Sequence, residues 1–218
     1  MATPTPLPIE AVLFDYGMVL SGPPDPAAWT QMQAITGFDE ATLDHAYWAP
    51  RHAYDRGDLT GQQYWQTVGQ AGGTTLSPEQ LTALIDADTA LWTRTNDPMI
   101  AWADRLQRAG IRTGILSNLG DAMTLGVVGK FAWIEAFHHR LWSHTLKLAK
   151  PEAAIYHHAI TGLGVTPEHI LFIDDRENNV EAGRAAGMQV IRYLDHAAFE
   201  QELIERGWGH LWMPEPRP

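Results

Sequence analysis

The stretch of sequence that decides the fold is Ala-Val-Leu-Phe-Asp-Tyr-Gly, residues 11–17. Its first four residues are all apolar, which is typical of a strand buried on both faces in a parallel sheet. Two later stretches have a similar form. Residues 111–116 lead into Ser117-Asn118, and residues 169–173 lead into Asp174-Asp175. We therefore expect three buried parallel strands, each followed by polar side chains.

Helix signals separate these stretches in the second half of the chain. Asp97 is an N-cap followed by proline, which predicts a helix that ends at Gly110. Further helices are expected over residues 150–162, and from Asn178 or Asn179 to residue 186. A fourth apolar run at residues 188–193 suits one more strand. This alternation predicts an α/β fold with a Rossmann-like, doubly wound parallel sheet.

Residues 21–93 have a different character, because they carry helix signals and no convincing strand pattern. Helical stretches are expected around residues 27–35, 40–48, 62–71 and 78–93. Ser77, Pro78 and Gln80 form a strong helix start, with a serine cap, proline at the first position and glutamine at the third. We therefore predict an inserted helical cap subdomain at residues 21–93 and a core made of residues 1–20 and 94–218.

The composition excludes several classes of function. The chain has 218 residues, with 15 Lys plus Arg against 26 Asp plus Glu and a formal net charge of −11. Nucleic acids and anionic membranes are bound by clusters of cations, so we exclude both as partners. Cysteine is absent, which removes disulfides, thiolate nucleophiles and Cys-ligated metal sites. Residues 1–9 lack the features of a signal peptide, and no apolar run approaches the roughly 20 residues that span a bilayer, so we expect a cytoplasmic protein.

The polar residues that follow the predicted strands form a candidate site. In an open parallel sheet, ligands bind at the carboxyl ends of the strands. Asp15, Ser117-Asn118 and Asp174-Asp175 all fall at such ends. Each alone could cap a helix or form a turn, but three strands that end in this way indicate a functional site.

These residue types suit phosphoryl chemistry. Two carboxylates, Asp15 and Asp174, repel each other unless a cation lies between them, and Mg²⁺ is the expected ion. A carboxylate is also a competent nucleophile toward phosphorus. Ser117 and the N–H groups that open the following helix can bind phosphate oxygens, and Lys150 supplies a fixed cation. Asp175 is expected to orient Lys150 or a metal-bound water.

Four segments together resemble the haloacid dehalogenase-like hydrolase superfamily. They are residues 14–20, 115–118, 150–152 and 172–175, the last accompanied by Asn179-Val180-Glu181. They occur in the family's order and cover the core from residue 12 to residue 193. The family also places a helical cap after its first motif, where we infer the insertion.

The resemblance implies a role for each matching residue. Asp15 would be the nucleophile, and Ser117 and Lys150 would hold the transferring group. Asp15, the Gly17 carbonyl and Asp174 would ligate Mg²⁺. Substrate contacts are expected from Asn118, Tyr16, Asn179 and Arg56.

Arg56 belongs to the predicted cap. Its segment, residues 54–60, resembles the cap loop of sugar-phosphate phosphatases, in which a polar residue faces the active site. Arg56 would then contact a phosphate or a hydroxyl, and nearby aromatic side chains could stack on a sugar or ring. The alternative is a solvated turn in which Arg56 pairs with Asp55 or Asp58. Tyr47, Trp48, Arg51, His52 and Tyr54 belong to the same cluster.

Position 17 departs from the pattern of most phosphatases of the family, which carry a general acid and base Asp two residues after the nucleophile. This chain has Gly17 there. General acid–base help is typically worth about 10²–10⁴-fold. Without it the enzyme would be slow, unless the acid role falls to water, to a cap residue or to a good leaving group. The first motif resembles a subgroup that includes sugar-phosphate phosphatases.

The sequence thus predicts a Mg²⁺-dependent phosphatase of a small phosphorylated metabolite, such as a sugar phosphate. The reaction would pass through an aspartyl-phosphate on Asp15, in a monomer or homodimer. One alternative is a metal-independent 2-haloacid dehalogenase, which the acidic pair Asp174-Asp175 disfavours. The other, suggested by Gly17, is a catalytically impaired protein that binds a phosphorylated ligand.

Overall fold

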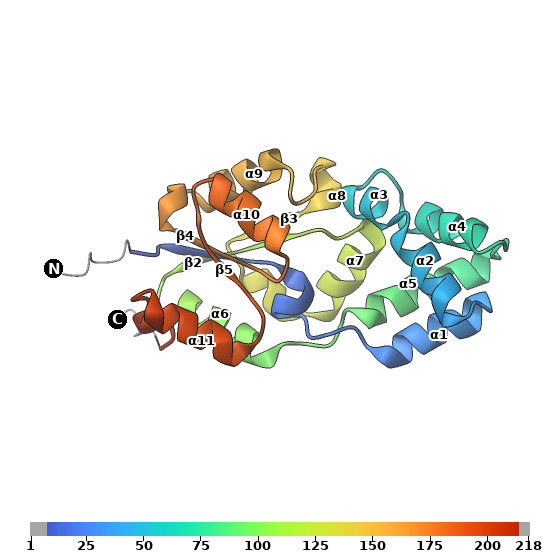
Figure 1. Cartoon of the computed structure of the whole chain (residues 1–218), viewed down its shortest axis with the longest axis horizontal. Helices are drawn as coiled ribbons and strands as arrows, with labels where there is room; N and C mark the ends of the chain where they lie inside the picture. The colour runs from blue at the N-terminus through green and yellow to red at the C-terminus, as the bar shows by residue number, and fades with distance from the viewer. Residues whose placement is uncertain (1–7, 214–218) are drawn as a thin grey trace.

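Five parallel strands form a single sheet in the computed structural model, which describes residues 8–213 (Figure 1). The strands are β1 (Ala11–Phe14), β2 (Arg112–Ser117), β3 (His139–Trp142), β4 (Ile170–Asp174) and β5 (Gln189–Arg192). Their order across the sheet is β3-β2-β1-β4-β5. Val12 lies opposite Thr113 on one side and Leu171 on the other. The outer ends of the predicted core, residues 1–7 and 214–218, lie outside the described residues.

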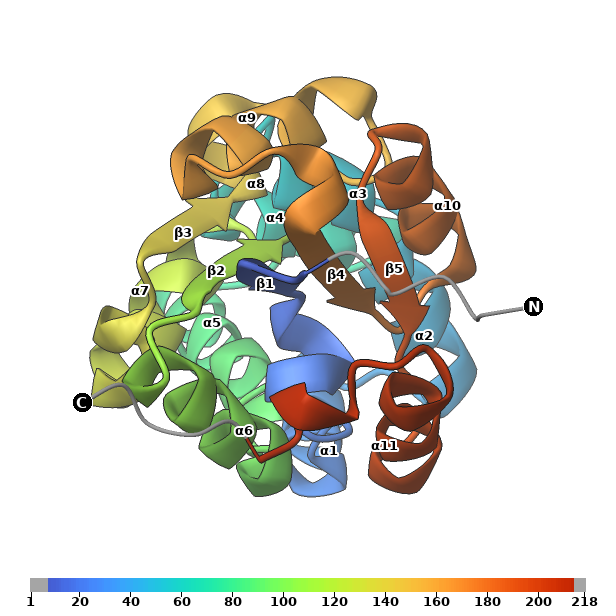
Figure 2. The same ribbon diagram turned by 90° about the vertical axis from the view of Figure 1, so that its left-hand side faces the viewer.

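Helices cover both faces of the sheet, because successive side chains of each strand point to opposite faces. Val12 and Phe14 pack on one face with α6 (Asp97–Arg108) and α11 (His196–Glu205). Ala11 and Leu13 pack on the other face with α9 (Ala153–Leu163) and α10 (Glu177–Ala185). Figure 2 shows the two pairs of helices on opposite sides of the sheet. The predicted α/β fold with a doubly wound parallel sheet is confirmed.

Five further helices gather at one end of the molecule and form what we call the helical lobe (Figure 1). They are α1 (Pro26–Thr36), α2 (Glu40–Trp48), α3 (Arg51–Arg56), α4 (Gly61–Ala71) and α5 (Pro78–Leu91). The lobe lies beyond the carboxyl ends of the strands. The remaining helices of the core are α7 (Asp121–Lys130) and α8 (Ser143–Leu146). No helix between residues 8 and 213 is both long enough and apolar enough to traverse a lipid bilayer.

Several local predictions agree with the structure, and some need correction. Ser77 and Gln80 form the expected reciprocal cap at the start of α5. The helix α6 begins at Asp97, one residue earlier than expected, because its N-cap is Asn96 rather than Asp97. The helix α10 begins at Glu177, earlier than expected, because its cap position is Arg176. The helix α7 was expected after Ser117 without stated bounds, whereas the strand β3 and the helices α3, α8 and α11 were not predicted.

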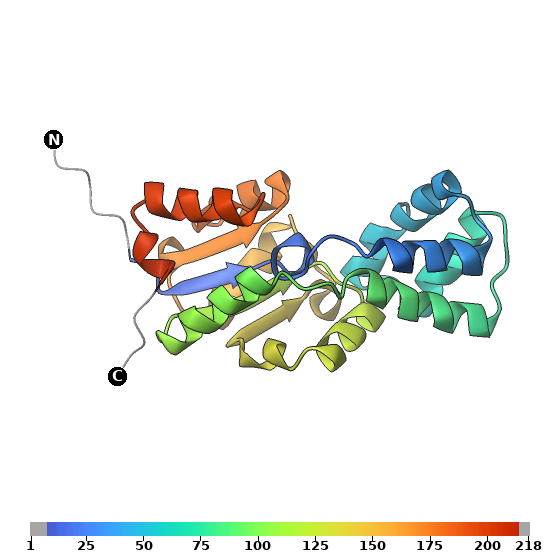
Figure 3. The ribbon, with the colours of Figure 1, turned by 90° about the horizontal axis from the view of Figure 1, so that it is seen from below.

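Two linkers join the lobe to the core and run side by side (Figure 3). The first follows a single turn, η1 (Tyr16–Leu20), which is closed by a bond from the Ser21 N–H to the Tyr16 carbonyl, and the second precedes α6. Ser21 and Thr95 form an antiparallel bridge between them. The Gly22 N–H donates to the Arg94 carbonyl at 2.8 Å. The chain therefore leaves the core and returns to it at residues that are bonded to each other.

Candidate active site

A cavity of about 210 Å³ lies between the carboxyl ends of the strands and the helical lobe. The core contributes Asp15, Tyr16, Gly17, Met18, Ser117, Asn118, Leu119, Lys150, Asp175, Arg176 and Asn179. The lobe contributes Trp48, Arg51 and Asp55, and the second linker contributes Trp92. Because β1, β2 and β4 are neighbours in a parallel sheet, the residues at their carboxyl ends meet at this edge. The structure thus brings together most of the residues predicted from the sequence.

Lys150 is at the centre of the charged groups. Its Nζ lies 2.9 Å from Asp15 Oδ1 and 2.6 Å from Asp174 Oδ2, and all three side chains are buried. The Asn118 side chain bonds both backbone polar groups of Lys150, its carbonyl and its N–H. Its Nδ2 donates to the Lys150 carbonyl at 2.9 Å, and its Oδ1 accepts from the Lys150 N–H at 2.8 Å. Asn118 lines the cavity, but its amide group is engaged in positioning Lys150.

Asp174 and Asp175 have different surroundings. Asp174 is fully buried, accepts from the Arg176 N–H at 2.9 Å, and accepts from Asn179 Nδ2 at 3.0 and 3.1 Å. Asp175 lines the cavity. Of the two roles expected of Asp175, the contact with Lys150 is made by Asp174 instead, and the orientation of a metal-bound water stays a prediction. Asn179, expected to bind substrate, lines the cavity while its side chain holds Asp174.

Burial strongly perturbs these ionisable groups. Burial raises the pKa of Asp15 to about 7; Lys150 opposes this rise, and Asp174 and Asp175 add to it. Burial also raises the pKa of Asp175, with a further contribution from Asp174. Burial alone would lower the pKa of Lys150, but Asp15 and Asp174 raise it overall. The site thus holds more negative charge than Lys150 neutralises.

The carboxylates provide the donor set of a metal site. One oxygen from each of Asp15, Asp174 and Asp175 can be chosen so that all three lie within 4.8 Å of one another. Oxygen ligands of this kind are those that Mg²⁺ prefers. A divalent cation would also relieve the repulsion between the carboxylates. The residues present therefore fit the predicted ion.

Position 17 lies in the cavity wall and has room for a side chain. Gly17 lines the cavity, and a Cβ built there would meet no heavy atom within 4 Å. Its backbone, at φ −62° and ψ 131°, is open to any residue type. The neighbouring Met18 has a φ of 58°, which is rare outside glycine and costs backbone strain.

Tyr16 lines the cavity, but its hydroxyl donates to the Trp92 carbonyl in the second linker at 2.8 Å. Tyr16 was expected to bind substrate, whereas its buried ring joins the first motif to that linker. Trp92 also lines the cavity. The aromatic wall is completed by Trp48, whose residue surface is 49% exposed.

Arg56 does not line the cavity, contrary to the expected substrate contact, and the alternative pairing with Asp58 is present. Its Nη1 pairs with Glu152 of the core at 2.7 Å, and its Nε lies 3.5 Å from Asp58. The cavity-lining arginine is Arg51, which begins α3. In the sequence, Arg51 stands within an aromatic and basic cluster that does not single it out from its neighbours. If residues 51–56 are taken as a helix, its geometry places Arg51 and Arg56 on different faces.

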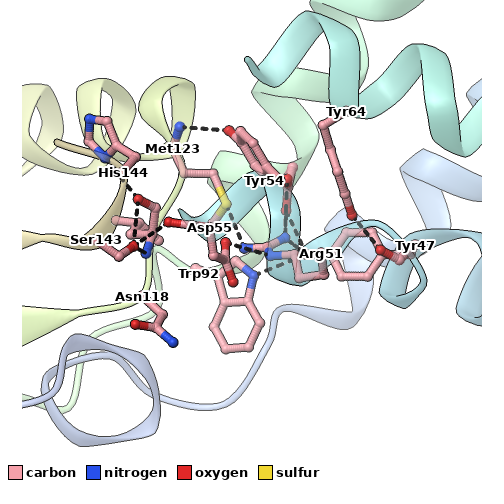
Figure 4. A network of polar contacts seen from close by, with 12 residues as sticks. Tyr47, Arg51, Tyr54, Asp55, Tyr64, Trp92, Asn118, Met123, Ser143 and His144 are labelled. Carbon is pink, nitrogen blue, oxygen red and sulfur yellow. Dashed lines mark hydrogen bonds and ion pairs between the residues drawn. The ribbon is translucent and has the colours of Figure 1, made fainter. Parts of the chain in front are cut away.

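Arg51 lies in a buried network within the lobe (Figure 4). Its Nε donates to Asp55 Oδ1 at 2.9 Å, and its Nη1 lies 3.3 Å from Asp88 Oδ1. Tyr47 accepts a further bond from Arg51 and donates to Asp88 at 2.7 Å. The Asp55 backbone carbonyl accepts from Ser143 Oγ of the core. Figure 4 shows Asp55 between Arg51 and Ser143, where the lobe meets the core.

Comparisons with known proteins agree with this arrangement. The family model described as haloacid dehalogenase-like hydrolase matches residues 18–187. A phosphoglycolate phosphatase from Nitrosococcus oceani is 32% identical over 92 residues. That match covers 42% of this chain and 40% of the relative, so it spans less than half of either protein.

Solved structures are similar over almost the whole chain. An HAD family enzyme from Bacteroides thetaiotaomicron has a TM-score of 0.75 at 18% identity, covering 90% of this chain and 99% of that one. The same enzyme has been solved in complex with magnesium and inorganic phosphate. The L-2-haloacid dehalogenase of Xanthobacter autotrophicus, with chloropropionic acid covalently bound, has a TM-score of 0.63 at 19% identity, covering 95% and 89%. At these identities the likeness establishes the fold alone.

Proposed function

Because this chain belongs to the haloacid dehalogenase-like hydrolase family, we propose that it hydrolyses the phosphate monoester of a small metabolite, with Mg²⁺ as cofactor. The observation that carries the proposal is the cluster of Asp15, Asp174 and Asp175 around one point beside Lys150. A dehalogenation at carbon gains nothing from such a cluster, whereas phosphoryl transfer needs charge neutralisation. The partial match to a phosphoglycolate phosphatase supports the same class of reaction.

Each core residue has a defined role in the proposed reaction. Asp15 attacks the phosphorus in line, and the resulting aspartyl-phosphate is then hydrolysed by water. Ser117 and Lys150 hold the oxygens of the transferring group, and Asn118 and Asp174 position Lys150. When bound, Mg²⁺ would offset the charge of the carboxylates and of the phosphate oxygens. Its proposed ligands are Asp15, Asp174, Asp175 and the Gly17 carbonyl.

The helical lobe, as part of the proposed cap at residues 21–93, would select the substrate. The cavity of about 210 Å³ is below the roughly 300–1,000 Å³ of typical ligand pockets, which favours a small metabolite. Trp48 and Trp92 offer flat apolar surfaces to the part of the substrate that does not react. Sugar phosphates and short phosphorylated acids are the classes that fit these dimensions.

The test is phosphate release from p-nitrophenyl phosphate and from a panel of phosphorylated sugars and acids. We expect turnover that requires Mg²⁺, stops with a chelator and returns when Mg²⁺ is added again. Asp15→Asn should abolish turnover, because an amide cannot attack phosphorus. Asp44→Asn is the matched control, since Asp44 is an exposed residue of α2 outside the cavity. Turnover that survives in Asp15→Asn, or that ignores the chelator, would contradict the proposal.

The same protein sample tests the two alternatives. A dehalogenase would release chloride from 2-chloropropionate without metal. An impaired binding protein would bind phosphate or phosphosugars in calorimetry, in a Mg²⁺-dependent manner, and give no product with any member of the panel.

A further inference from the structure

The helical lobe contributes an aspartate to the lining of the cavity at which the reaction is proposed to occur. Asp55 lies in α3 and lines the same cavity as Asp15, Ser117 and Lys150. Its side chain is 15% exposed, so the surrounding protein shields it from bulk water but not from the cavity. The phosphatase scheme described above gives this residue no role.

The contacts of Asp55 fix its orientation and leave one oxygen available. Oδ1 accepts from Arg51 Nε at 2.9 Å, and the backbone carbonyl accepts from Ser143 Oγ. Among residues 8–213, no hydrogen bond reaches Oδ2. A carboxyl group held by one oxygen and by its backbone is well placed to exchange a proton through the other oxygen.

The charges around Asp55 suit proton exchange near neutral pH. Burial raises the pKa of Asp55 to about 6. Arg51, on the same helix, opposes this rise, and Asp88, from α5, adds to it. His52, also in α3, opposes it weakly when charged. A group with a pKa close to the working pH is an efficient general acid and base.

Gly17 makes such a group necessary. The position that carries an acid–base Asp in the resembling phosphatases has no side chain here, although the cavity has room for one. A phosphate monoester with a poor leaving group requires protonation of the leaving oxygen as the bond to phosphorus breaks. Asp55 is a cavity-lining carboxyl group outside the predicted metal site.

We propose that Asp55 is the general acid and base of the phosphatase reaction, in place of the side chain that Gly17 lacks. The inference rests on the proposed function. In the first step Asp15 forms a bond to phosphorus, the bond from phosphorus to the leaving oxygen breaks, and Asp55 gives its proton to that oxygen. In the second step a water oxygen bonds to the phosphorus of the aspartyl-phosphate, and the water proton passes to Asp55. The bond from Asp15 to phosphorus then breaks, which releases hydrogen phosphate and restores both carboxyl groups.

The test compares Asp55→Asn with wild type on two substrates. p-Nitrophenolate leaves without protonation, whereas a sugar alkoxide does not. We expect kcat/KM for a sugar phosphate to fall by about 10²–10⁴-fold and kcat/KM for p-nitrophenyl phosphate to change little. With p-nitrophenyl phosphate the variant should also give a burst of p-nitrophenol, because the second step has lost its base. Introducing Gly17→Asp into the variant should restore sugar-phosphate turnover.

Asp44→Asn is the control, because Asp44 is exposed and lies outside the cavity. Its kcat/KM should match that of wild type on both substrates. Equal losses on both substrates in Asp55→Asn would overturn the inference and leave the phosphatase proposal intact. Wild-type protein that hydrolyses no phosphate monoester would overturn the proposed function itself.

Should Asp55→Asn fail to fold, the wild-type enzyme supplies an independent measurement. A series of aryl phosphates with leaving groups of increasing basicity would be compared by kcat/KM. A weak dependence on leaving-group basicity supports proton donation, and a steep dependence overturns it.

Discussion

At the scale of single residues, Gly57 determines how closely the helical lobe approaches the core. It ends α3 with a φ of 88°, in the left-handed region. A Cβ at this position would lie 2.6 Å from the carbonyl oxygen of His144, in the core helix α8. The residue therefore has to be glycine for two separate reasons, its conformation and its contact with the core.

Gly57→Ala should separate these two reasons when it is compared with Gly73→Ala. Gly73 also has a left-handed φ, 79°, but a Cβ there would meet nothing within 4 Å. Gly73→Ala should lower the free energy of unfolding by about 1–2 kcal/mol, the cost of the left-handed conformation. Gly57→Ala should cost about 1–3 kcal/mol more, because the backbone must shift. Urea unfolding measures the free energy of unfolding of both variants. Equal losses of that free energy would show that the lobe can move away from the core at no cost.

Asp55 should also make stability depend on pH. Its pKa of about 6 in the folded chain lies above the ordinary value of 3.8, so the folded state binds the proton more tightly. The free energy of unfolding contributed by Asp55 should therefore fall as pH rises from about 4 to about 6, by up to about 1.4 kcal/mol per pH unit. The Asp55→Asn variant lacks this pH-dependent loss. Its free energy of unfolding, relative to that of wild type, should therefore rise between about pH 4 and about pH 6. Parallel curves for the two proteins would contradict the prediction, and Asp44→Asn provides the reference.

The core part of the site could be predicted from single residues, whereas the lobe part could not. Asp15, Ser117 and Asp174 each end a strand of one parallel sheet, and topology alone brings such ends together. The side chains of Asp55 and Arg51 reach the cavity only because α3 is a helix set at one angle to the core. No local pattern in the sequence encodes that angle.

At the scale of elements, α3 explains why the wrong arginine was expected in the cavity. Residues four apart lie on one face of a helix, and Arg51 and Asp55 have that spacing. Residues five apart are rotated by about 140° from each other, at about 100° per residue. Arg56 therefore points elsewhere, toward Glu152, when Arg51 points into the cavity. The expectation was wrong because residues 54–60 were read as a loop.

Arg56→Gln tests this assignment against Arg51→Gln. Both partners in the Arg56–Glu152 pair are about one-third exposed (34% each), so its loss should cost about 1 kcal/mol or less. The KM of the Arg56→Gln variant for substrate should not change. Arg51→Gln removes a buried cation between Asp55 and Asp88, which should cost about 3–5 kcal/mol. Urea unfolding and steady-state kinetics measure both effects, and a strongly raised KM in Arg56→Gln would return that residue to substrate binding.

The strand β3 was missed for a physical reason. It has four residues, it pairs only with β2, and its first two residues are the polar His139 and Arg140. An edge strand of this kind needs no continuous apolar run, because one of its sides is not covered by another strand. The inner strands β1, β2 and β4 were predicted because they are buried on both faces. The other edge strand, β5, was predicted because residues 188–193 include four apolar or aromatic side chains.

At the scale of the whole molecule, one apolar cluster runs from the sheet into the helical lobe. It includes Phe14 and Trp102 of the core together with Tyr64 and Trp65 of the lobe. Parts of a chain that have separate hydrophobic cores can fold independently, but a shared core couples the lobe to the rest of the molecule. The lobe and the core should therefore lose their structure together.

Scanning calorimetry should show a single unfolding transition for the full chain. The calorimetric enthalpy should equal the van't Hoff enthalpy, as it does for two-state unfolding. Tryptophan fluorescence and far-ultraviolet circular dichroism should give coincident midpoints. Two resolved transitions, or midpoints that differ between the probes, would show that the lobe unfolds on its own.

The paired linkers also have an evolutionary consequence. Since Ser21 and Thr95 are bridged, the two ends of the segment that carries the helical lobe are joined in space, whatever the length of that segment. Helices can be gained, lost or exchanged between these two residues without a change in strand order, provided that the replacement presents an apolar face to the shared cluster. Replacement of the lobe would therefore change the side chains that line one wall of the cavity, while the residues at the strand ends keep their positions.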